Sequence, residues 1–246
     1  MEENKGPFIL DSKRALIGSV NGILFYDLVW PYCVLLLMHL ILQGSYNSLV
    51  DTKPQFMSLI LVMGTSVLTL IAAVIIAKPQ TLIGAYKKIN LSNVKFIFKC
   101  LISMFIFSYC YNLILIMSGI DVSGGNANQG NVLILIQSHE VLAFIAMVII
   151  APLLEEITYR YFLFGGIAKY NRKWAIVISA FVFMAVHATA SFTQNTDNIF
   201  RELVLLPPYM FSGMVLAYAY DKSNNLTTST TIHALNNLIS FVLCLL

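Results

Sequence analysis

The sequence predicts an all-α polytopic integral membrane protein with seven transmembrane helices, or eight if one apolar segment is broken. Of its 246 residues, 58% are hydrophobic and only 11% are charged, whereas an ordinary soluble domain carries about a quarter charged residues. Apolar runs close to the roughly 20 residues that cross a bilayer recur along the whole chain. We therefore expect one membrane domain, residues 1–246, and no separate soluble domain.

Seven apolar stretches define the expected spans, which cover residues 23–43, 57–77, 94–119, 138–168, 174–191, 202–220 and 226–246. Pro152 lies in the fourth span, and Pro207 and Pro208 lie in the sixth. Because proline removes a backbone donor, a broken or re-entrant helix at either place would raise the number to eight. The first apolar run is too long for a signal-peptide core and lacks a small-x-small cleavage pattern, so we expect it to remain as an anchor.

The basic residues predict the orientation. If the N-terminus is inside, inner loops hold eleven Lys and Arg residues and outer loops hold two, Lys53 and Arg201. By the positive-inside rule we expect a multi-pass protein of the cell membrane with a cytoplasmic N-terminus. The net charge of +3 is small and dispersed among these loops, so the lipid bilayer is an expected partner and nucleic acid is not.

Four cysteines, Cys33, Cys100, Cys110 and Cys244, lie far apart inside apolar segments. They form no CxxC motif and no Cys/His pair of metal-ligand spacing. We expect them to be buried free thiols that pack as small apolar residues.

The stretch APLLEEITYRYFLFGG, residues 151–166, places Glu155, Glu156 and Arg160 inside the fourth span. An ionised carboxylate at membrane depth costs several kcal/mol unless it is paired or faces a polar cavity. Glu156 and Arg160 are four residues apart and can pair on one helix face. Glu155 lies about 100° around the helix and is left without that partner, so a structural ion pair does not explain it.

Two later spans carry polar groups at the same spacing. Phe183 and His187 are four residues apart in one span, and His233 and Asn237 are four residues apart in the last. A histidine inside a membrane span indicates function more often than one in a soluble core. We therefore expect three helices to enclose a polar intramembrane cavity.

In this order, Glu155-Glu156-xxx-Arg160, Phe183-xxx-His187 and His233-xxx-Asn237 resemble the motifs of the CPBP intramembrane proteases, also called the CAAX prenyl protease 2-like or Abi family, with Rce1-type members. A chain of this composition is expected to match EExxxR by chance only about 0.002 times. The resemblance covers residues 137–246 as a CPBP-like catalytic core, whereas the N-terminal helices in residues 1–136 carry no such signature.

The resemblance implies an intramembrane endopeptidase that acts on a peptide or a membrane-associated protein. Bacterial members of the family are associated with pheromone or bacteriocin-type peptide maturation and with self-immunity. The Ile-, Lys- and Asn-rich composition suits a bacterium with an AT-rich genome. The sequence does not specify the substrate, the cleavage site or the oligomeric state.

Residue chemistry suggests the roles. Hydrolysis without a Ser or Cys nucleophile needs a base that activates water and donors that stabilise the oxyanion. We expect Glu155 to be the base and His187 to hold the water, while His233 and Asn237 donate to the oxyanion. The pair Glu156 and Arg160 would support them.

The expected depths of these residues in the membrane argue against a single site, because straight helices would leave His233 shallower than Glu155 and His187. A bend at Pro152 or at Gly165 and Gly166 is expected to align them.

Cofactor and function alternatives remain open. No cofactor is favoured, because the resemblance favours a metal-free glutamate mechanism. Zinc held by two His and one Glu is the alternative, although HExxH is absent and Asn237 is a poor zinc ligand.

A non-catalytic membrane regulator or immunity protein would bind a partner through the same cavity. A proton-coupled transporter would use Glu155, His187 and His233 as a relay, but the sequence lacks the internal repeat of many such folds.

Overall fold

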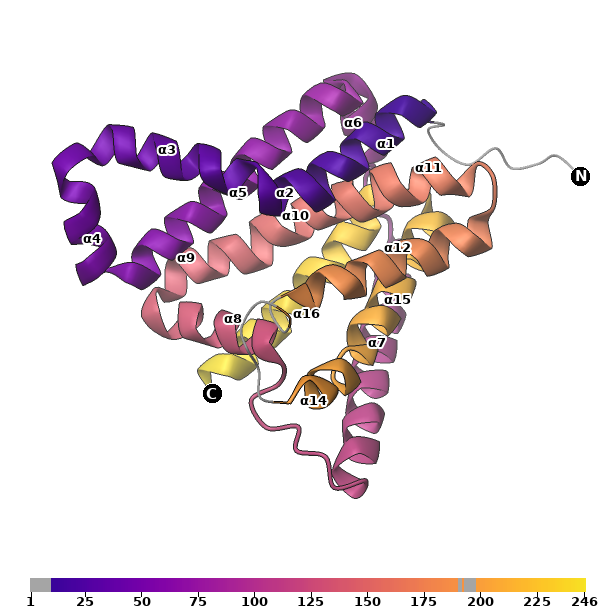
Figure 1. Cartoon of the computed structure of the whole chain (residues 1–246). Coiled ribbons are helices and arrows are strands. Elements are labelled where there is room, and N and C mark those ends of the chain that lie inside the picture. Colours follow the sequence, from indigo (N-terminus) through magenta and orange to yellow (C-terminus); the bar gives the residue numbers. More distant parts are fainter. Residues whose placement is uncertain (1–9, 190–191, 193–197) are drawn as a thin grey trace, which may run out of the picture.

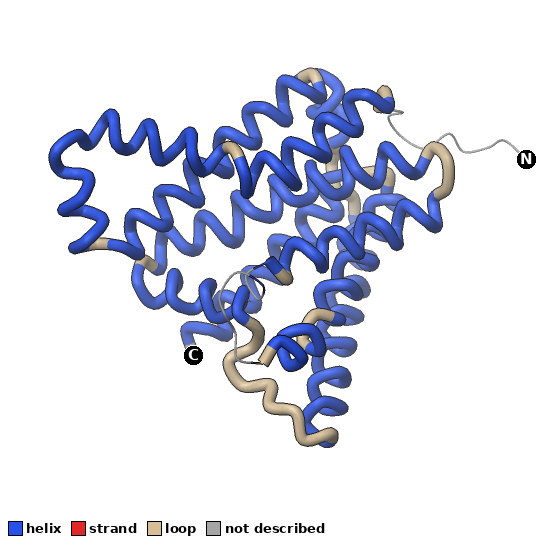
Figure 2. The backbone as a smooth tube through the Cα atoms, in the orientation of Figure 1, coloured by secondary structure: helices blue, strands red, loops and turns tan. Residues whose placement is uncertain are grey.

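The computed structural model describes residues 10–189, 192 and 198–246, and within these residues it contains helices and no strand (Figure 2). Six of its helices are long and apolar enough to cross a membrane: Trp30–Thr52, Pro54–Ala77, Leu91–Met117, Glu140–Ala168, Ile199–Ser223 and Leu226–Leu245. The prediction of an all-α polytopic membrane protein is confirmed.

Figure 1 labels the elements along the described chain. In chain order they are α1 (Ser12–Val20), η1 (Asn21–Phe25), α2 (Tyr26–Leu28), α3 (Trp30–Leu42), η2 (Gln43–Ser45), α4 (Tyr46–Thr52), α5 (Pro54–Ala77), α6 (Pro79–Ala85), α7 (Leu91–Met117), α8 (Ala127–Ser138), α9 (Glu140–Phe144), η3 (Ile145–Ile150), α10 (Ala151–Glu156), η4 (Ile157–Phe164), α11 (Gly165–Ala168), α12 (Arg172–His187), α14 (Ile199–Val204), α15 (Pro207–Ser223) and α16 (Leu226–Leu245).

The expected span 174–191 differs from the others. It corresponds to α12, which has 16 residues and rises about 24 Å, less than the roughly 30 Å of a bilayer core. The end of the expected span, Ala190 and Ser191, lies outside the described residues. Among the described residues, six of the seven predicted spans overlap a long apolar helix, and the remaining one is the short helix α12. The first predicted span, 23–43, begins before its long helix, which starts at Trp30, and the α-helix α3 within it has only 13 residues.

The two proline sites behave differently. Pro207 and Pro208 interrupt the predicted sixth span, because α14 ends at Val204 and α15 begins at Pro207. Pro152 does not end its helix; the chain continues through α10, with the π-helical segments η3 and η4 on either side. A π-helix is rare and occurs mostly as a short segment inside an α-helix.

The fourth long helix, α9 to α11, is the centre of the molecule (Figure 1). Its segment η4 packs against α1 and α12, while α10 packs against α16. Helix α12 packs along α15, which also contacts α7 and α16. Helices α3 and α4 pack against α5 and project from this assembly (Figure 1).

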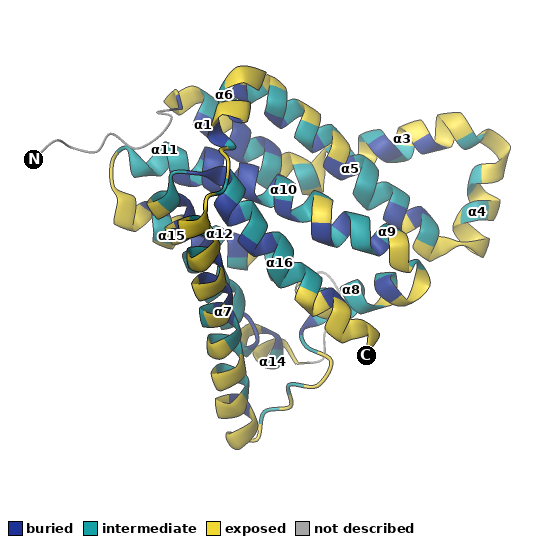
Figure 3. Ribbon diagram, turned by 180° about the vertical axis from the view of Figure 1, so that it is seen from behind, coloured by how far each residue is buried: buried dark blue, intermediate teal, exposed yellow. Residues whose placement is uncertain are grey.

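The central helices contain most of the buried residues, whereas α3 and α4 are mostly exposed (Figure 3). Phe162, Leu226 and Ala217 are completely buried in the central cluster, whereas Ile41 of α3 is 76% exposed. Gly213 allows α15 to approach α12, because a Cβ at this position would lie 2.9 Å from the Ala180 Cα atom. Small residues of this kind allow close helix packing in membranes.

Asparagine side chains begin five helices. Each side chain accepts a hydrogen bond from a backbone N–H in the first turn of the helix that follows. The five residues are Asn90, Asn126, Asn171, Asn198 and Asn225. These N-caps satisfy donors that a helix leaves unpaired at its start. They explain locally where α7, α8, α12, α14 and α16 begin.

The prediction of buried cysteines is wrong for two of the four. Cys100 is buried and Cys33 is partly buried, but Cys110 and Cys244 are exposed. An apolar position in a membrane helix can face lipid rather than protein, so apolar surroundings in the sequence do not establish burial.

Candidate active site

The ion pair between Glu156 and Arg160 lies in the protein interior. Both side chains are 0% exposed, and Arg160 Nε lies 3.3 Å from Glu156 Oε2. The guanidinium also lies over the rings of Phe183, at 5.1 Å, and Tyr159, at 5.8 Å. This environment orients Glu156 and leaves its Oε1 atom available to accept a hydrogen bond.

His233 of α16 lies between the two adjacent glutamates. Its Nδ1 atom is 3.0 Å from Glu156 Oε1. Because a carboxylate only accepts, we assign the proton to Nδ1, which donates to Glu156. Its Nε2 atom faces Glu155 Oε2 at 3.7 Å, which is beyond hydrogen-bond reach. Glu156 therefore orients His233 so that Nε2 and the Glu155 carboxylate face each other.

Glu155 and Glu156 differ in environment although they are neighbours in sequence. The Glu155 side chain is 24% exposed, compared with 0% for Glu156. The Glu155 carboxylate interacts electrostatically with three tyrosines from different parts of the chain, Tyr26, Tyr159 and Tyr209. Its Oε2 atom is buried and has no hydrogen-bond partner among the described residues, so this oxygen keeps its capacity to accept a hydrogen bond.

His187, near the end of α12, is held by aromatic rings and a backbone carbonyl. Its Nδ1 atom is 2.8 Å from the Phe183 carbonyl oxygen; since a carbonyl only accepts, Nδ1 donates and Nε2 is the remaining nitrogen. The imidazole packs on Phe183, with ring centroids 4.4 Å apart, and on Tyr209, at 4.6 Å. Phe183 also contacts His233, at 5.7 Å, and His187 interacts electrostatically with Glu155.

Asn237 has a partner that the sequence did not suggest. Its Nδ2 atom donates to the Met147 carbonyl oxygen at 3.0 Å. In η3 the hydrogen bonds span five residues, as from the Ala151 N–H to the Ala146 oxygen. The next such bond would join residue 152 to Met147, but Pro152 has no N–H. Asn237 supplies the missing donor, and its second Nδ2 hydrogen remains for another acceptor.

The expected difference in depth does not separate the groups. Glu155, Glu156 and His233 lie within contact distance of one another, with the two π-helical segments on either side of the glutamates. The structure therefore brings together Glu155, Glu156, Arg160, His187 and His233, and it places Asn237 against the backbone of the glutamate-bearing helix.

Tyr26 and Tyr209 were missed by sequence reasoning, because they belong to other helices and share no motif with the glutamates. One signal was present: Tyr209 directly follows Pro207 and Pro208, where the sixth span was expected to break.

Zinc is the alternative cofactor that the sequence suggested. Among the described residues, no three His, Cys, Asp or Glu side chains are grouped so that they would hold a metal ion as they are placed. Glu156 is engaged by Arg160 and by His233 Nδ1, so it is not free to be the glutamate of a two-His, one-Glu zinc set.

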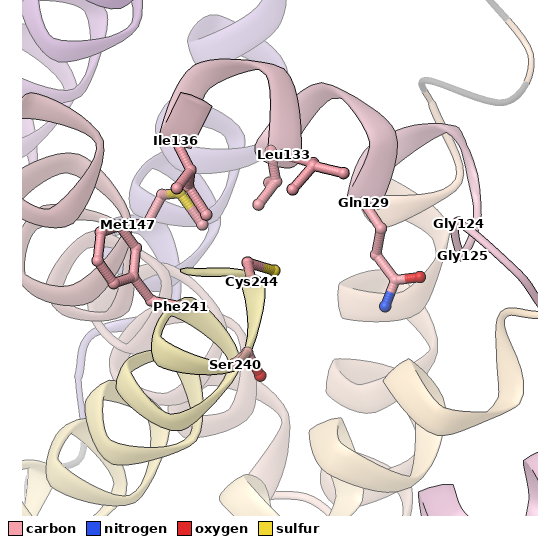
Figure 4. Close-up of a pocket in the computed structure, with 10 residues that line it drawn as sticks. Gly124, Gly125, Gln129, Leu133, Ile136, Met147, Ser240, Phe241 and Cys244 are labelled. Carbon is pink, nitrogen blue, oxygen red and sulfur yellow. The ribbon is translucent and has the colours of Figure 1, made fainter. Parts of the chain in front are cut away.

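An apolar cavity of about 280 Å³ lies between α8 and the last turns of α16 (Figure 4). Leu133 and Ile136 line it on one side, and Phe241 and Cys244 line it on the other. It reaches Met147, whose carbonyl accepts from Asn237. The cavity thus adjoins the helix that bears the glutamates, although the six predicted site residues are not among its lining residues.

Comparisons with known proteins find matches in the part of the chain that contains the three motifs. Residues 137–239 match the family described as type II CAAX prenyl endopeptidase Rce1-like, which confirms the resemblance that the three motifs predicted.

The curated relatives come from two bacteria. The chain is 33% identical over 90 residues to the UPF0177 protein YxdF of Lactococcus lactis subsp. lactis (strain IL1403), covering 37% of this chain and 43% of that protein. It is 35% identical over 102 residues to the UPF0177 protein YaiF of the same strain, covering 40% and 39%. An uncharacterized protein of Mycoplasma capricolum subsp. capricolum (strain California kid) is 36% identical over 104 residues, covering 42% and 27%. The chain thus spans less than half the length of each relative, and no solved structure matches it.

Proposed function

Residues 137–239 are Rce1-like, and we propose that the protein is an intramembrane endopeptidase in which Glu155 activates the water that hydrolyses a peptide bond. One observation carries the proposal. The Glu155 carboxylate is partly exposed and faces the Nε2 atom of His233 at 3.7 Å, while Glu156 orients that ring through Nδ1. A base and a second polar group facing a shared space are what water activation requires.

The proposed reaction follows from these positions. Glu155 takes a proton from water held between its free oxygen and the Nε2 atom of His187, and the water oxygen bonds to the substrate carbonyl carbon. When His233 is protonated at both nitrogens, Nε2 donates to the oxyanion, and the second Nδ2 hydrogen of Asn237 is a further donor. As the C–N bond breaks, Glu155 returns the proton to the leaving amine.

No step is assigned to a metal ion. Arg160 holds Glu156 as an anion, and Glu156 in turn fixes the ring of His233. These are supporting roles, since neither group contacts the reacting bond in the proposed geometry.

The proposed substrate is a peptide or a membrane-associated protein with apolar side chains near its cleavage site. The apolar cavity beside Met147 offers a place for such a side chain (Figure 4). Maturation of pheromone or bacteriocin-type peptides, or self-immunity, remains a proposal that comes from the family resemblance. A location in the cell membrane with the N-terminus in the cytoplasm is also a proposal, and the loop charges favour it.

The test compares wild type with Glu155→Gln, both purified in detergent, for cleavage of a labelled membrane-peptide library. Glu140→Gln is the matched control, because Glu140 is an exposed glutamate at the start of the same long helix. We expect Glu155→Gln to lower cleavage about 10²- to 10⁴-fold and Glu140→Gln to leave it unchanged.

A strong zinc chelator in a parallel reaction separates the two mechanisms. We expect no loss of cleavage with the chelator; inhibition that added zinc reverses would restore the metal-dependent alternative. If wild type and Glu155→Gln cleave equally, Glu155 is not the base. If both stay folded and neither cleaves any peptide in the library, the non-catalytic regulator becomes the better description.

A further inference from the structure

The first half of α16 carries a run of hydroxyl residues that the proposed reaction does not use. Residues 227–231 read Thr-Thr-Ser-Thr-Thr and directly precede the segment with His233. Thr228 and Ser229 are 0% exposed. The hydroxyls of Thr228 and Thr230 are buried and have no hydrogen-bond partner among the described residues. Threonine in a helix usually bonds back to a carbonyl of the preceding turn, so these two hydroxyls need another explanation.

These hydroxyls connect the glutamate site to a loop at one end of α16. The Ser229 hydroxyl donates to the Leu226 carbonyl at 3.2 Å and also interacts with the Glu156 carboxylate, and the Thr230 hydroxyl interacts with that of Tyr86. Tyr86 follows α6 and interacts electrostatically with Glu156.

Asn225 closes the connection at the surface. It accepts a hydrogen bond from the Lys87 N–H at 3.0 Å and donates to the Lys87 carbonyl at 3.2 Å. Lys87 itself is exposed, so polar groups extend from a surface loop to Glu156. We call the side chains of Tyr86, Thr228, Ser229 and Thr230 the hydroxyl column.

The Arg160 guanidinium lies at the inner end of the same region. It is 0% exposed and carries five N–H donors. Its Nε atom approaches Glu156, but none of its three nitrogens makes a hydrogen bond of good geometry to a described residue. The rings of Phe183 and Tyr159 attract the charge, yet an aromatic face does not replace the acceptors that these donors require.

Energetics favours water as the partner of these groups. A buried polar atom without a partner destabilises the fold, and more so if it is charged. Buried water binds where several such atoms lie together, and each molecule typically makes about three hydrogen bonds. The hydroxyls of Thr228, Thr230 and Tyr86 and the guanidinium of Arg160 are buried groups of this kind, and both Tyr86 and Arg160 interact with Glu156.

We propose that the hydroxyl column is a hydrated path that brings water and protons from the Tyr86–Lys87 loop to Glu156, His233 and the water-activating Glu155. The other access to Glu155 is its exposed side, which a bound peptide would cover. A separate path then replaces the water consumed in each turnover. Only this supply role depends on the proposed function; the hydration itself does not.

Hydration is tested without reference to activity. Single cysteines are placed at Thr230, Lys87 or Ile232 in a chain whose four native cysteines are replaced by alanine. Silver ion, which is small enough to follow water, forms an S–Ag bond and releases the thiol proton to the buffer. The fraction of silver-bound thiol in the folded protein is measured by mass spectrometry.

Lys87→Cys is the exposed reference, and Ile232→Cys is the matched buried control. Ile232 is on the same helix and 0% exposed, but it packs in an apolar cluster with Ile97 and Leu216. We expect Thr230→Cys to react at a rate close to that of Lys87→Cys, and Ile232→Cys to stay protected. Equal protection of Thr230→Cys and Ile232→Cys would overturn the hydrated path.

A second measurement addresses the supply role. Thr228→Val and Thr230→Val keep the side-chain shape and remove the hydroxyl, with Thr231→Val as the control on the same helix. We expect kcat to fall several-fold for the first two variants while KM stays constant. If the hydroxyls are merely unsatisfied groups in a dry core, removing them should raise stability and leave kcat unchanged, and that result would overturn the proposal.

The two proposals fail separately. A chain in which Glu155→Gln retains full cleavage, but Thr230→Cys reacts with silver, contradicts the glutamate mechanism and leaves the hydration intact. A chain in which Glu155→Gln is inactive, but Thr230→Cys is protected, contradicts the hydrated path alone.

Discussion

The segments Trp30–Thr52 and Glu140–Ala168 are both apolar enough to cross a membrane, yet they occupy different environments. The mean hydropathy of their most apolar windows is 1.5 and 2.1, and the buried share of those windows is 11% and 44%. The first segment presents Leu40 and Ile41 to its surroundings, whereas the second buries Tyr161 and Phe162. An apolar composition thus suits either lipid or protein neighbours. The buried ion pair of Glu156 and Arg160 belongs to the second segment because only protein neighbours supply partners for charges in the interior, whereas Asp51 of the first segment is exposed.

The largest expected effect concerns the buried ion pair. Arg160→Met should lower the free energy of unfolding by about 3–5 kcal/mol, because it leaves the Glu156 charge in the interior without its main partner. The double variant Glu156→Gln with Arg160→Met should lose much less, since neither charge remains unpaired. Unfolding by SDS titration in mixed micelles measures both.

The control for the ion pair lies near the protein surface. Arg172 and Asp221 are 3.6 Å apart, and the Arg172 side chain is 46% exposed, so Arg172→Met should cost no more than about 1 kcal/mol. Equal losses for Arg160→Met and Arg172→Met would contradict the distinction between the two environments.

The next effect concerns apolar packing in the two compared segments. Phe162→Ala should cost about 3–5 kcal/mol, because the side chain is 0% exposed and its removal leaves a cavity beside Gly18 and Tyr161. Ile41→Ala, at a position 76% exposed, should change stability by only about 0.5 kcal/mol. The same SDS titration measures both, and a loss at Ile41 that matches the loss at Phe162 would show that α3 is packed against protein.

A smaller effect is expected from adding one methyl group. Gly213→Ala places a Cβ 2.9 Å from the Ala180 Cα and 3.2 Å from the Ala180 carbonyl oxygen, which forces α15 away from α12. We expect a loss of about 1–3 kcal/mol. Gly44→Ala is the control, because nothing lies within 4 Å of a Cβ there. Thermal unfolding in detergent compares them, and an unchanged melting temperature for Gly213→Ala would mean that the two helices separate at little cost.

The smallest effect on stability is expected in the loop before α8, which lies outside both compared segments. Hydrogen bonds from Ser123 and the nearby Arg201 guanidinium lower the pKa of Asp121. A lowered pKa in the folded state adds stability above the unfolded-state pKa, about 3.9, and this stability is lost as the pH falls through the folded-state pKa.

This dependence is measured by comparing Asp121→Asn with wild type in thermal unfolding at several pH values. We expect a small deficit of Asp121→Asn that is constant from pH 8 to pH 5 and shrinks only in acid below about pH 4. A deficit that grows as the pH falls would contradict the sign of the shift.

Sequence patterns predicted the long helices well. The expected spans 57–77 and 94–119 correspond to Pro54–Ala77 and Leu91–Met117, because a run of about 20 apolar residues in lipid must satisfy its backbone within one helix. The boundaries differ where caps or prolines act. Asn90 begins α7 and Pro207 begins α15, and neither signal depends on hydropathy.

The site was predicted in part. The pair of Glu156 and Arg160 follows from a spacing of four residues within one helix. The environment of Glu155 was not predicted, because Tyr26 and Tyr209 come from distant helices. The partner of Asn237 was not predicted either, because the vacant Met147 carbonyl arises only when Pro152 coincides with a π-helical segment.

By itself the sequence determined the membrane class, the approximate spans and the contacts made within one helix, because these follow from apolar length and from a fixed helical period. Only the tertiary structure decided that His233 lies between Glu155 and Glu156, that α12 is short, and that Asn225 binds the backbone of Lys87. Such contacts depend on which faces of separate helices meet, and packing between helices sets those faces, which no local period specifies.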